Sequence, residues 1–523
     1  MKVYTYDSTL RDGAQGELVS FSLMDKINIT KALDEFGVDY IEAGNPFSNP
    51  KDIEYFKEIK NYKFSHSKLV AFGSTRKKGI KACDDSSVKI MAGVCADTVA
   101  IFGKSWDLHV REILGTTLEE NLDMISDTVS YLTECGKDVF FDAEHYFDGY
   151  KANPEYAMLT LKTAQRAGAK YIVLCDTNGG CFPDEIAEMT RLAVETLEVP
   201  VGIHCHNDTE CGVASSISAV KAGATQVQGT FIGIGERCGN TNLSSLIPSL
   251  QLKLGYECVD GDKLKHITKT SRYIAEIANV ALHDNMPYVG KSAFAHKAGM
   301  HADGVMKASH SFEHVSPSLV GNNRSFLLSE VAGRTTVLSK LSDFAPEITK
   351  ESDDLLAIME MLKAQEHKGY HYEAAEASFE LLVLKFLGKF KEFFHIEYFK
   401  IIGEQSGSFQ KAASAMVKVE VGGKTEIAAD EGDGPVNALD KALRTALSRF
   451  YPEIINQVEL IDYKVRVMNT NSGTAAVVRV LIESTDGTDT WTTVGASTDI
   501  INASVKALVD SIEYKLYRNL KKQ

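Results

Sequence analysis

The stretch TYDSTLRDGAQGE, residues 5–17, decides between two folds for the first half of the chain. It begins as a β-strand and ends in a polar loop that carries Asp7, Arg11, Asp12 and Gln15. An open, doubly wound α/β sheet usually has a glycine-rich turn after its first strand. Charged side chains at this position favour a closed (β/α)8 barrel instead, because the carboxyl ends of barrel strands converge on the face where active sites are built.

Strand-like and helix-like patterns alternate through the residues that follow. The strand-like runs are KVYTYDSTL, VDYIEAG, KLVAFGST, VKIMAGVCA, DVFFDAEHY, YIVLCDTNG, VGIHCHND and ATQVQGTFIGIG, separated by helical patterns such as TLEENLDMISDTVSYLTECG. Parallel strands need long crossover connections, which are usually helices. Eight such units predict an α/β fold, a TIM barrel over residues 1–285, with the open sheet as the alternative.

Composition and charge exclude several classes of protein. The chain has 523 residues, of which 44% are hydrophobic and 24% charged, as in soluble globular proteins. No run approaches the roughly 20 apolar residues of a membrane helix, and the N-terminus lacks the apolar core of a signal peptide. The net charge of -15 argues against nucleic-acid binding. Nine scattered cysteines without a C-x-x-C pair predict a reduced, cytoplasmic chain.

Polar residues stand at the ends of several strand-like runs: Asp7, Glu42, Glu144, Asp176, His204 and His206. The sharpest signal is HCHND, residues 204–208. Residues two apart in a strand point to the same side, so both imidazoles are expected to face the barrel mouth. Two imidazoles and a carboxylate suit Mn²⁺, Mg²⁺ or Zn²⁺, and we expect Asp7 to supply the carboxylate. The alternative is a pair of structural histidines.

A second signal, GERCGN at residues 235–240, follows the last strand-like run. The amide oxygen of Asn240 can join a hard-cation site. Alternatively, Asn240 only caps a helix that begins near NLSSLI. The residues alone favour neither role.

Six motifs together resemble one known family. DSTLRDGAQ, EAGNPFSNPKD, CDTNGG, HCHNDTECG, GERCGN and HKAGMHADG occur in order. The chain resembles, over essentially its whole length, the acyl-CoA-condensing synthases, which include 2-isopropylmalate, homocitrate and citramalate synthases. It is most similar to the long citramalate synthase type.

The resemblance implies a Claisen-type condensation. Acetyl-CoA loses a methyl proton and attacks the C2 carbonyl of a 2-oxo acid, and the thioester is then hydrolysed. The implied metal ligands are Asp7, His204, His206 and Asn240. The metal would polarise the carbonyl as a Lewis acid.

The resemblance also implies roles for residues around the reacting centre. Arg11 would lie beside the keto oxygen, and Thr177 would bind the 2-oxo acid carboxylate. Glu144 would act as the base, because a C–H next to a thioester is a weak acid. His301 would work with Glu144 from a segment that in the family reaches the partner subunit's active site. On the residues alone, Arg11 could instead form a surface salt bridge, Thr177 a turn and His301 an ordinary loop contact.

Substrate choice depends on a few positions. Asp142 belongs to the substrate-binding set because, in the family, its neighbourhood faces the side chain of the 2-oxo acid. A carboxylate there disfavours a large apolar substituent, which favours pyruvate and (R)-citramalate over the substrates of 2-isopropylmalate or homocitrate synthase. Phe312 replaces a tyrosine and Ser316 an aspartate that relatives often carry. The Phe312 change raises a different alternative, a catalytically impaired, amino-acid-sensing regulatory protein.

The pattern changes near residue 375. Strand-like runs are FELLVLKFL, AMVKVEV, YKVRVM and VVRVLIE, and VNALDKALRTAL at 436 aligns with INASVKALVDSI at 501. Each copy follows a hairpin signal, which predicts two α+β units that pack together. The repeat resembles the family's regulatory domain, which implies a homodimer and a branched-chain amino acid effector, expected to be isoleucine, near ADEGDGP and VGASTD. We therefore predict a regulatory domain at 375–523 and helical linker subdomains at 286–374.

Overall fold

The computed structural model describes residues 1–296, 299–326, 334–342, 344–372, 375–403, 413–468 and 476–522. They form two compact units, which we describe separately. One comprises Met1–Phe294 and Glu313–Arg324, and the other Ala295–Phe312 and Ser325–Gln523. In these ranges no helix is both long and apolar enough to cross a bilayer.

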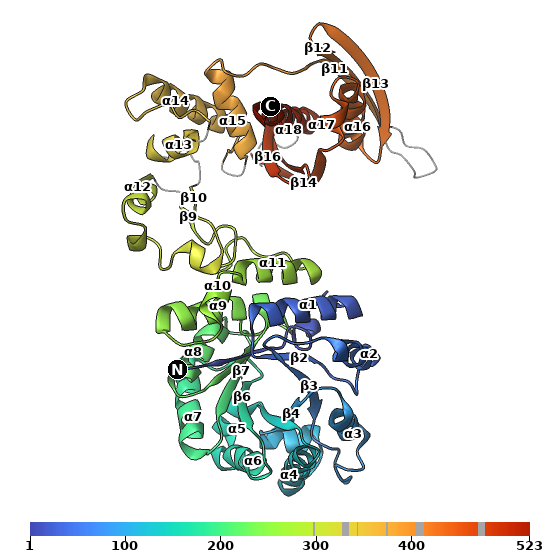
Figure 1. Ribbon diagram of the computed structural model, residues 1–523, viewed down its shortest axis with the longest axis vertical. Helices are drawn as coiled ribbons and strands as arrows, with labels where there is room; N and C mark the ends of the chain where they lie inside the picture. Colours follow the sequence, from blue (N-terminus) through green and yellow to red (C-terminus); the bar gives the residue numbers. More distant parts are fainter. Residues whose placement is uncertain are drawn as a thin grey trace. The chain divides into compact units, whose positions relative to one another are not determined.

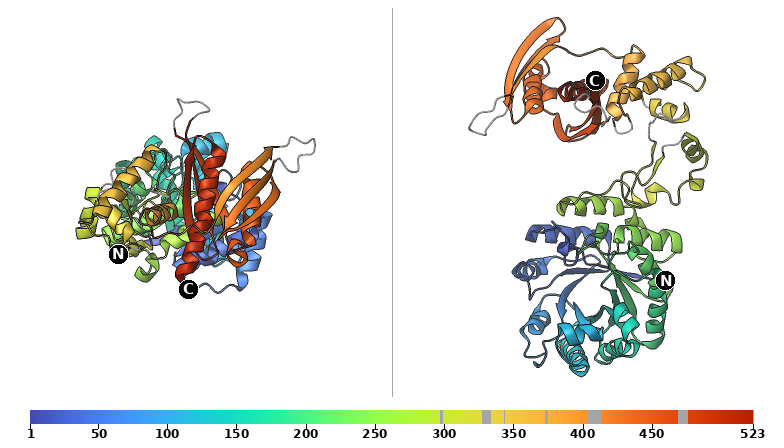
Figure 2. Two further views of the ribbon diagram at one scale, coloured as in Figure 1. Left: turned by 90° about the horizontal axis from the view of Figure 1, so that it is seen from above. Right: turned by 180° about the vertical axis from the view of Figure 1, so that it is seen from behind.

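The first unit is a closed barrel of eight parallel strands in sequence order, which confirms the predicted TIM barrel (Figures 1 and 2, blue to green). The strands are β1 (Tyr4–Asp7), β2 (Tyr40–Gly44), β3 (Lys68–Ser74), β4 (Thr98–Lys104), β5 (Asp138–Glu144), β6 (Tyr171–Asp176), β7 (Val201–Cys205) and β8 (Gln226–Gly229). The helices are α1 (Leu23–Phe36), α2 (Pro50–Glu58), α3 (Ser86–Gly93), α4 (Leu118–Glu134), α5 (Tyr146–Ala152), α6 (Pro154–Arg166), α7 (Pro183–Thr196), α8 (Gly212–Lys221), α9 (Leu243–Pro248), α10 (Gly261–Leu264) and α11 (Ile267–Ile277).

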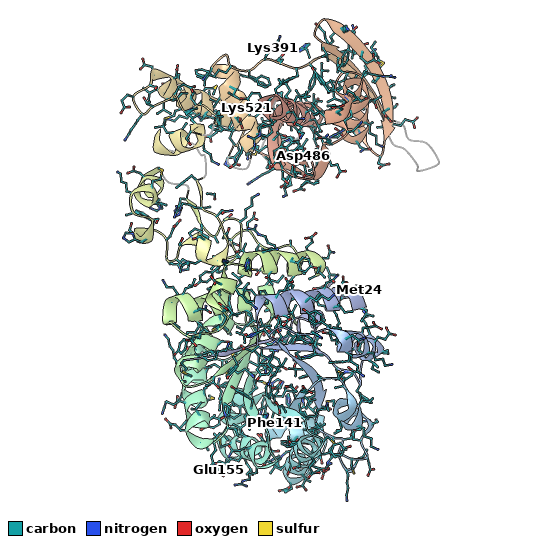
Figure 3. All side chains as sticks on the ribbon, in the orientation of Figure 1. Met24, Phe141, Glu155, Lys391, Asp486 and Lys521 are labelled. Carbon is teal, nitrogen blue, oxygen red and sulfur yellow. The ribbon has the colours of Figure 1, made fainter. Side chains whose placement is uncertain are left out.

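Side chains alternate along each barrel strand between two environments. Those that point outward, such as Ile41, Phe141 and Ile203, pack against the helices in the main apolar core (Figure 3, which labels Phe141). Those that point inward change from mostly apolar to charged and polar along the barrel axis. A cluster of Tyr6, Val70, Ala100, Phe140 and Tyr171 fills part of the interior, and the charged and amide side chains described below follow toward the carboxyl ends of the strands.

Two predicted strands are helices. Most of VKIMAGVCA lies in α3, whose buried Val88 and Met91 are three residues apart and whose first turn is capped by Asp85. The fourth barrel strand is therefore the next segment, TVAIFGK. FELLVLKFL likewise lies mostly in α15 (Glu376–Phe386). Short apolar runs fit a buried helix and a buried strand equally well, and here the surrounding packing selects the helix.

The second unit begins with small helical elements. They are α12 (Gly299–Ala308), α13 (Arg334–Leu341), α14 (Asp353–His367) and α15, with the two-residue strands β9 (Ala295–His296) and β10 (Ser325–Phe326). Helices α13 to α15 share an apolar cluster that includes Val337, Ile358 and Phe379. The linker helices therefore pack against the start of the last part of the chain.

The last part of the chain contains the predicted tandem repeat. One copy is β11 (His395–Gly403), β12 (Ala413–Val421), β13 (Lys424–Gly432) and α16 (Pro435–Ser448). After α17 (Pro452–Ile455), the other is β14 (Glu459–Val467), β15 (Val478–Thr485), β16 (Thr490–Ser497) and α18 (Ile500–Lys522). Ile512 and Leu516 of α18 lie in the apolar core of the first copy, so the two copies bury surface together.

Candidate active site and metal centre

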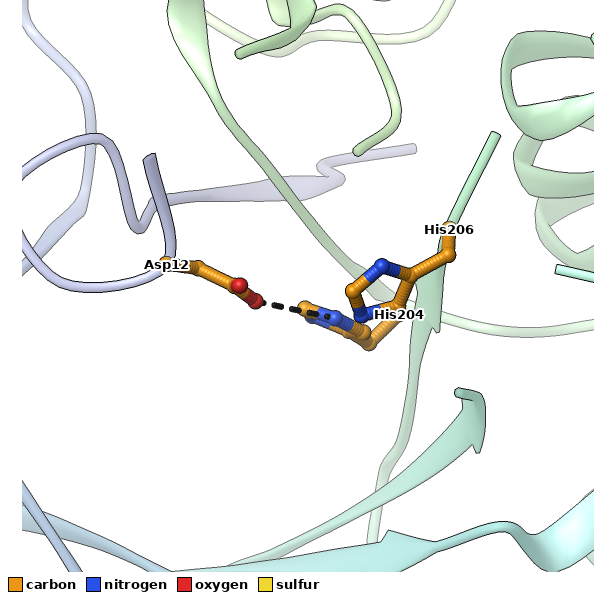
Figure 4. Close-up of side chains that lie close together, drawn as sticks. All are labelled: Asp12, His204 and His206. Carbon is orange, nitrogen blue, oxygen red and sulfur yellow. Dashed lines mark ion pairs between the residues drawn. The ribbon is translucent and has the colours of Figure 1, made fainter. Parts of the chain in front are cut away.

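Three buried side chains form a possible divalent-metal site at the barrel mouth. His204 and His206 come from the end of β7, and Asp12 from the turn after β1 (Figure 4). Nε2 of His204 is 3.4 Å from Oδ2 of Asp12. One potential ligand atom from each residue lies within 4.8 Å of the others. The side chains are 6%, 5% and 2% exposed respectively, so a cation there would be largely shielded from water.

The chemistry of these residues fits a cation. Burial lowers the pKa of His204, and it lowers that of His206 to about 4, so both imidazoles are neutral near pH 7. Nδ1 of His206 and Oδ1 of Asn240 are buried, and neither has a hydrogen-bond partner among the described residues. Buried polar atoms are normally partnered, so two unpartnered atoms at the cluster fit additional ligands of a metal ion.

Asp12, and not Asp7, is the carboxylate beside the histidines. Tyr6 points into the barrel, so its neighbour Asp7 points outward, toward the helical layer. There the Asp7 carboxylate accepts hydrogen bonds from the backbone N–H and hydroxyl of Thr9, at 3.0 and 2.8 Å. Asp12, where the sequence predicted Asp7, is therefore the carboxylate of the possible metal site, because strand alternation continues to the last residue of β1 and turns Asp7 away.

The GERCGN loop holds Asn240 against the end of β7. Asn240 forms an isolated antiparallel bridge with His206. Asn242, rather than Asn240, caps α9, and its side chain accepts from the N–H of Ser244 at 3.0 Å. Gly239 has φ of 84°, and a Cβ there would lie 2.0 Å from the carbonyl oxygen of Gly233, so the loop needs glycine. The capping alternative for Asn240 is thus removed.

Arg11 is held by an acidic side chain and packs on the face of an aromatic ring. Its Nε donates to Oε2 of Glu42 at 2.6 Å, and its guanidinium carbon lies 3.8 Å from the centre of the Phe72 ring. Tyr6 donates to the other oxygen of Glu42 at 2.6 Å. Phe72 in turn stacks on Phe102, with ring centroids 5.4 Å apart. The arginine is therefore a fixed, partly buried cation and not a surface side chain.

The predicted substrate residues lie on the neighbouring strands. Glu144 is ion-paired with Lys104. The hydroxyl of Thr177 accepts from the backbone N–H of His145 at 2.9 Å, so its own hydrogen remains available to another acceptor. Burial, and then the nearby Glu42, raise the pKa of Asp142 well above its usual value.

Comparison with known proteins covers nearly the whole chain. A model for the HMGL-like family matches residues 2–274, one for the homocitrate synthase post-HMGL domain matches 288–369, and one for the LeuA allosteric (dimerisation) domain matches 373–516. The (R)-citramalate synthase of Aquifex aeolicus is 51% identical over 99% of this chain and 98% of its own. The chain belongs to the (R)-citramalate synthase family.

Other relatives agree with this assignment. The (R)-citramalate synthase of Geobacter sulfurreducens is 49% identical over 99% of this chain and 98% of its own. A probable 2-isopropylmalate synthase of Methanopyrus kandleri is 33% identical over 98% of each chain. This member of the citramalate synthase family is thus more distant from that 2-isopropylmalate synthase than from either citramalate synthase.

The remaining predicted residue, His301, lies in the second unit. It is exposed on α12, and its ring is 5.3 Å from that of Phe312. Gly304 makes room for Phe312, because a Cβ there would lie 2.2 Å from the phenylalanine ring. Of the HKAGMHADG motif, Lys297 and Ala298 lie outside the described residues. The role of His301 in this member of the citramalate synthase family stays a prediction.

Several residues around the mouth were missed by sequence reasoning. Phe102 and Lys104 lie on β4. The sequence pattern placed the fourth strand in the preceding segment, which is helix α3, so the alternation of side chains along β4 was not considered. Gln228, on β8, contacts His204 but lies in none of the motifs recognised in the sequence. The strand pattern YTYD could have shown that Asp7 points away from the mouth of a citramalate synthase barrel.

Proposed function

We propose that this chain is an acyltransferase that condenses acetyl-CoA with pyruvate and hydrolyses the thioester, giving (R)-citramalate and CoA. The observation that carries the proposal is 51% identity to an (R)-citramalate synthase over nearly the full length of both chains. The barrel mouth supports it, because a metal-binding cluster, an arginine and a carboxylate from different strands suit a condensation with a keto acid.

Asp12, His204, His206 and Asn240 would hold the divalent metal, and Mn²⁺ or Mg²⁺ is favoured over Zn²⁺. Two of the four ligands are hard oxygen donors, from a carboxylate and an amide, which suit these ions. When bound, the metal supplies Lewis-acid polarisation of the keto carbonyl.

Arg11 would stabilise the negative charge that develops on the keto oxygen. Its contacts with Glu42 and Phe72 keep the guanidinium in place before the substrate arrives. Thr177 would donate its hydroxyl hydrogen to the carboxylate of the 2-oxo acid, since the oxygen already accepts from His145. Both groups would thereby orient pyruvate toward the attacking carbon.

Glu144 would remove the methyl proton of acetyl-CoA. Its ion pair with Lys104 holds the carboxylate in place at the end of β5, from where a base would reach the methyl group. A cavity of about 310 Å³ opens beside Arg11, and its lining includes Gln15, Asn45, Lys51 and Phe72. His301 would complete the acid–base pair from the partner subunit of a homodimer.

Pyruvate is favoured by what surrounds the mouth. Asp142 is a polar group on the strand that carries Glu144. The stacked pair Phe72–Phe102 occupies the ends of two further strands. Burying an isopropyl group against the polar Asp142 would be unfavourable, whereas a methyl group would bury less apolar surface there.

The test is CoA-thiol release by metal-loaded protein with acetyl-CoA and pyruvate, 2-oxoisovalerate or 2-oxoglutarate. The highest kcat/KM is expected with pyruvate, and chiral chromatography should identify (R)-citramalate. A higher kcat/KM with 2-oxoisovalerate would assign a 2-isopropylmalate synthase, and with 2-oxoglutarate a homocitrate synthase. No release with any acid would favour the regulatory protein.

Isoleucine is the proposed effector of the second unit. Of the two helix N-termini named by sequence, that of α16 follows Gly434 and has no side-chain cap. The start of α18 is already occupied by Asp499, which accepts from the N–H of Ile501 at 2.9 Å. The α16 terminus is therefore the better place for an amino acid carboxylate. Millimolar isoleucine should inhibit the enzyme and raise its melting temperature. The absence of both effects would contradict the proposal.

A homodimer is proposed from the same unit. Apolar side chains are exposed on its outer strands: Tyr398, Ile402, Ile427, Ile461, Val465 and Val467. Exposed apolar surface of this kind is typical of interfaces. Sedimentation velocity should find twice the chain mass, and a monomer at micromolar concentration would contradict the proposal.

A further inference from the structure

Gln228, on β8, lies between a predicted metal ligand and a buried acid. Its Oε1 is 3.1 Å from Nδ1 of His204. Its Nε2 is 3.5 Å from Oδ1 of Asp142 and 3.4 Å from Oε1 of Gln226. Gln226 and Gln228 are both fully buried and both point into the barrel. None of the six motifs includes Gln228.

The contacts determine how the amide of Gln228 is oriented. The NH2 end lies beside Oδ1 of Asp142 and Oε1 of Gln226, and Asp142 keeps an acceptor oxygen even when its carboxyl group is protonated. The end that faces His204 is then the carbonyl oxygen, which can only accept a hydrogen bond. Nδ1 of His204 must therefore carry a hydrogen, because two lone pairs 3.1 Å apart would repel each other.

This orientation determines which nitrogen of His204 can bind a metal. A neutral imidazole has one N–H and one lone pair, so a hydrogen on Nδ1 leaves the lone pair on Nε2. Nε2 is the atom that lies 3.4 Å from Oδ2 of Asp12. The lone pair is thus directed to the side on which Asp12 offers its own oxygen, and a cation bound there would contact both.

We infer that Gln228 is a positioning residue for the metal centre, an inference that rests on the metal site proposed above. It holds His204 in the Nδ1–H tautomer and fixes the ring so that Nε2 faces the cation. Hydrogen-bond acceptors behind metal-bound histidines act in this way, and their loss typically lowers metal affinity about 10–100-fold. Asp142 and Gln226 act one step further back, by holding the NH2 group of Gln228.

The test uses the full-length chain, stripped of metal with a chelator and titrated with Co²⁺, whose d–d absorption reports its ligands. Gln228→Leu removes the acceptor and should weaken Co²⁺ binding about 10–100-fold and alter the spectrum. Gln228→Asn keeps the amide but shortens its reach, so it should show the same loss if the leucine variant does not fold. Gln228→Glu keeps an acceptor oxygen and should retain the wild-type spectrum, with affinity within about tenfold of wild type.

Asn121→Leu is the control, because it removes an equally buried amide, on α4, that contacts neither Gln228 nor a proposed metal ligand. Its Co²⁺ affinity should stay within about threefold of wild type. The inference is overturned if Gln228→Leu or Gln228→Asn binds like wild type. It is also overturned if Gln228→Glu is as weak as the leucine variant, or if Asn121→Leu loses as much affinity as Gln228→Leu.

The metal test is independent of the reaction. A wild-type chain that binds no Co²⁺ would remove the metal centre and this inference with it. A wild-type chain that binds Co²⁺ but releases no CoA from any 2-oxo acid would contradict the proposed function alone, and the affinities of the variants would still decide the role of Gln228.

Discussion

At the scale of single residues, the two aspartates of the DSTLRDG motif have opposite surroundings. Asp12 faces His204, whereas the Asp7 carboxylate is occupied by Thr9. We expect Asp12→Asn to weaken Mn²⁺ binding at least about tenfold, because it removes the anionic ligand. Asp7→Asn should bind Mn²⁺ like wild type. Calorimetric titration of the metal-free proteins checks this, and a larger loss in Asp7→Asn would restore the original assignment.

Glu144 offers a second prediction at this scale. Because a base acts mainly in the transition state, Glu144→Gln should lower kcat about 100–10,000-fold with little change in the KM for pyruvate. The exposed Glu155 provides the control, and Glu155→Gln should leave both constants unchanged. Steady-state kinetics with saturating acetyl-CoA would contradict the role of base if kcat were retained and only KM rose.

The buried Asp7 also leads us to predict how the stability of the fold depends on pH. Burial raises its pKa to about 7, although hydrogen bonds from Thr9 oppose the shift. A raised folded-state pKa means that the protonated form stabilises the fold. Its contribution is complete below the unfolded pKa of about 3.9 and is lost as the pH rises through about 7.

Asp7→Asn stays neutral at every pH and should escape this loss. From pH 4.5 to pH 8, the free energy of unfolding of wild type should therefore fall by roughly 2–4 kcal/mol relative to the variant. Urea denaturation of metal-free protein at both pH values measures the difference. A difference that does not change with pH would refute the assignment.

At the scale of elements, a buried ion pair joins α1, α2 and the end of β2. Lys26 of α1 pairs with Asp52 of α2 and donates to the carbonyl of Ala43 at 2.8 Å. Asp52 also accepts from the N–H of Asn45 at 2.9 Å. Gly44 allows this approach, because its φ is 144° and a Cβ would lie 2.2 Å from the Asp52 carboxylate. The pair thereby shapes the loop beside Arg11.

Breaking one half of this pair should be costly. Lys26→Met leaves Asp52 buried without its cation and should lower the free energy of unfolding by about 3–5 kcal/mol. Adding Asp52→Asn removes the charge but keeps an acceptor for Asn45, so the double variant should recover most of the loss. Chemical denaturation of the two variants decides this, and a double variant as unstable as the single one would argue against the ion pair.

At the scale of the whole molecule, we expect catalysis and regulation to reside in different parts of the chain. The barrel has its own apolar core, and the tandem repeat has others. Deleting residues 375–523 should therefore abolish inhibition by isoleucine while the barrel remains folded. Activity should fall, because the deletion removes the α15 residues that pack against the linker helices and the proposed dimer surface. Isoleucine titrations of both proteins test this, and a truncated chain that isoleucine still inhibits would contradict it.

The sequence by itself determined the features that depend on neighbouring residues. Alternation of strand and helix patterns predicted the barrel, and two matching segments predicted the tandem repeat. The H-x-H spacing placed His204 and His206 on one face, since alternation along a strand is a local property. The same rule, applied to YTYD, would have turned Asp7 away from the mouth.

Only the tertiary structure decided the features that depend on residues far apart in the chain. Asp12 is about 190 residues from His204 and becomes its neighbour because barrel closure pairs β1 with β8. Asn240 does not cap the helix, because it lies in a bridge with His206 and Asn242 caps α9 instead. The apolar run at residues 88–96 is mostly helical because its surroundings bury one helical face, and hydrophobicity alone does not distinguish that from a buried strand.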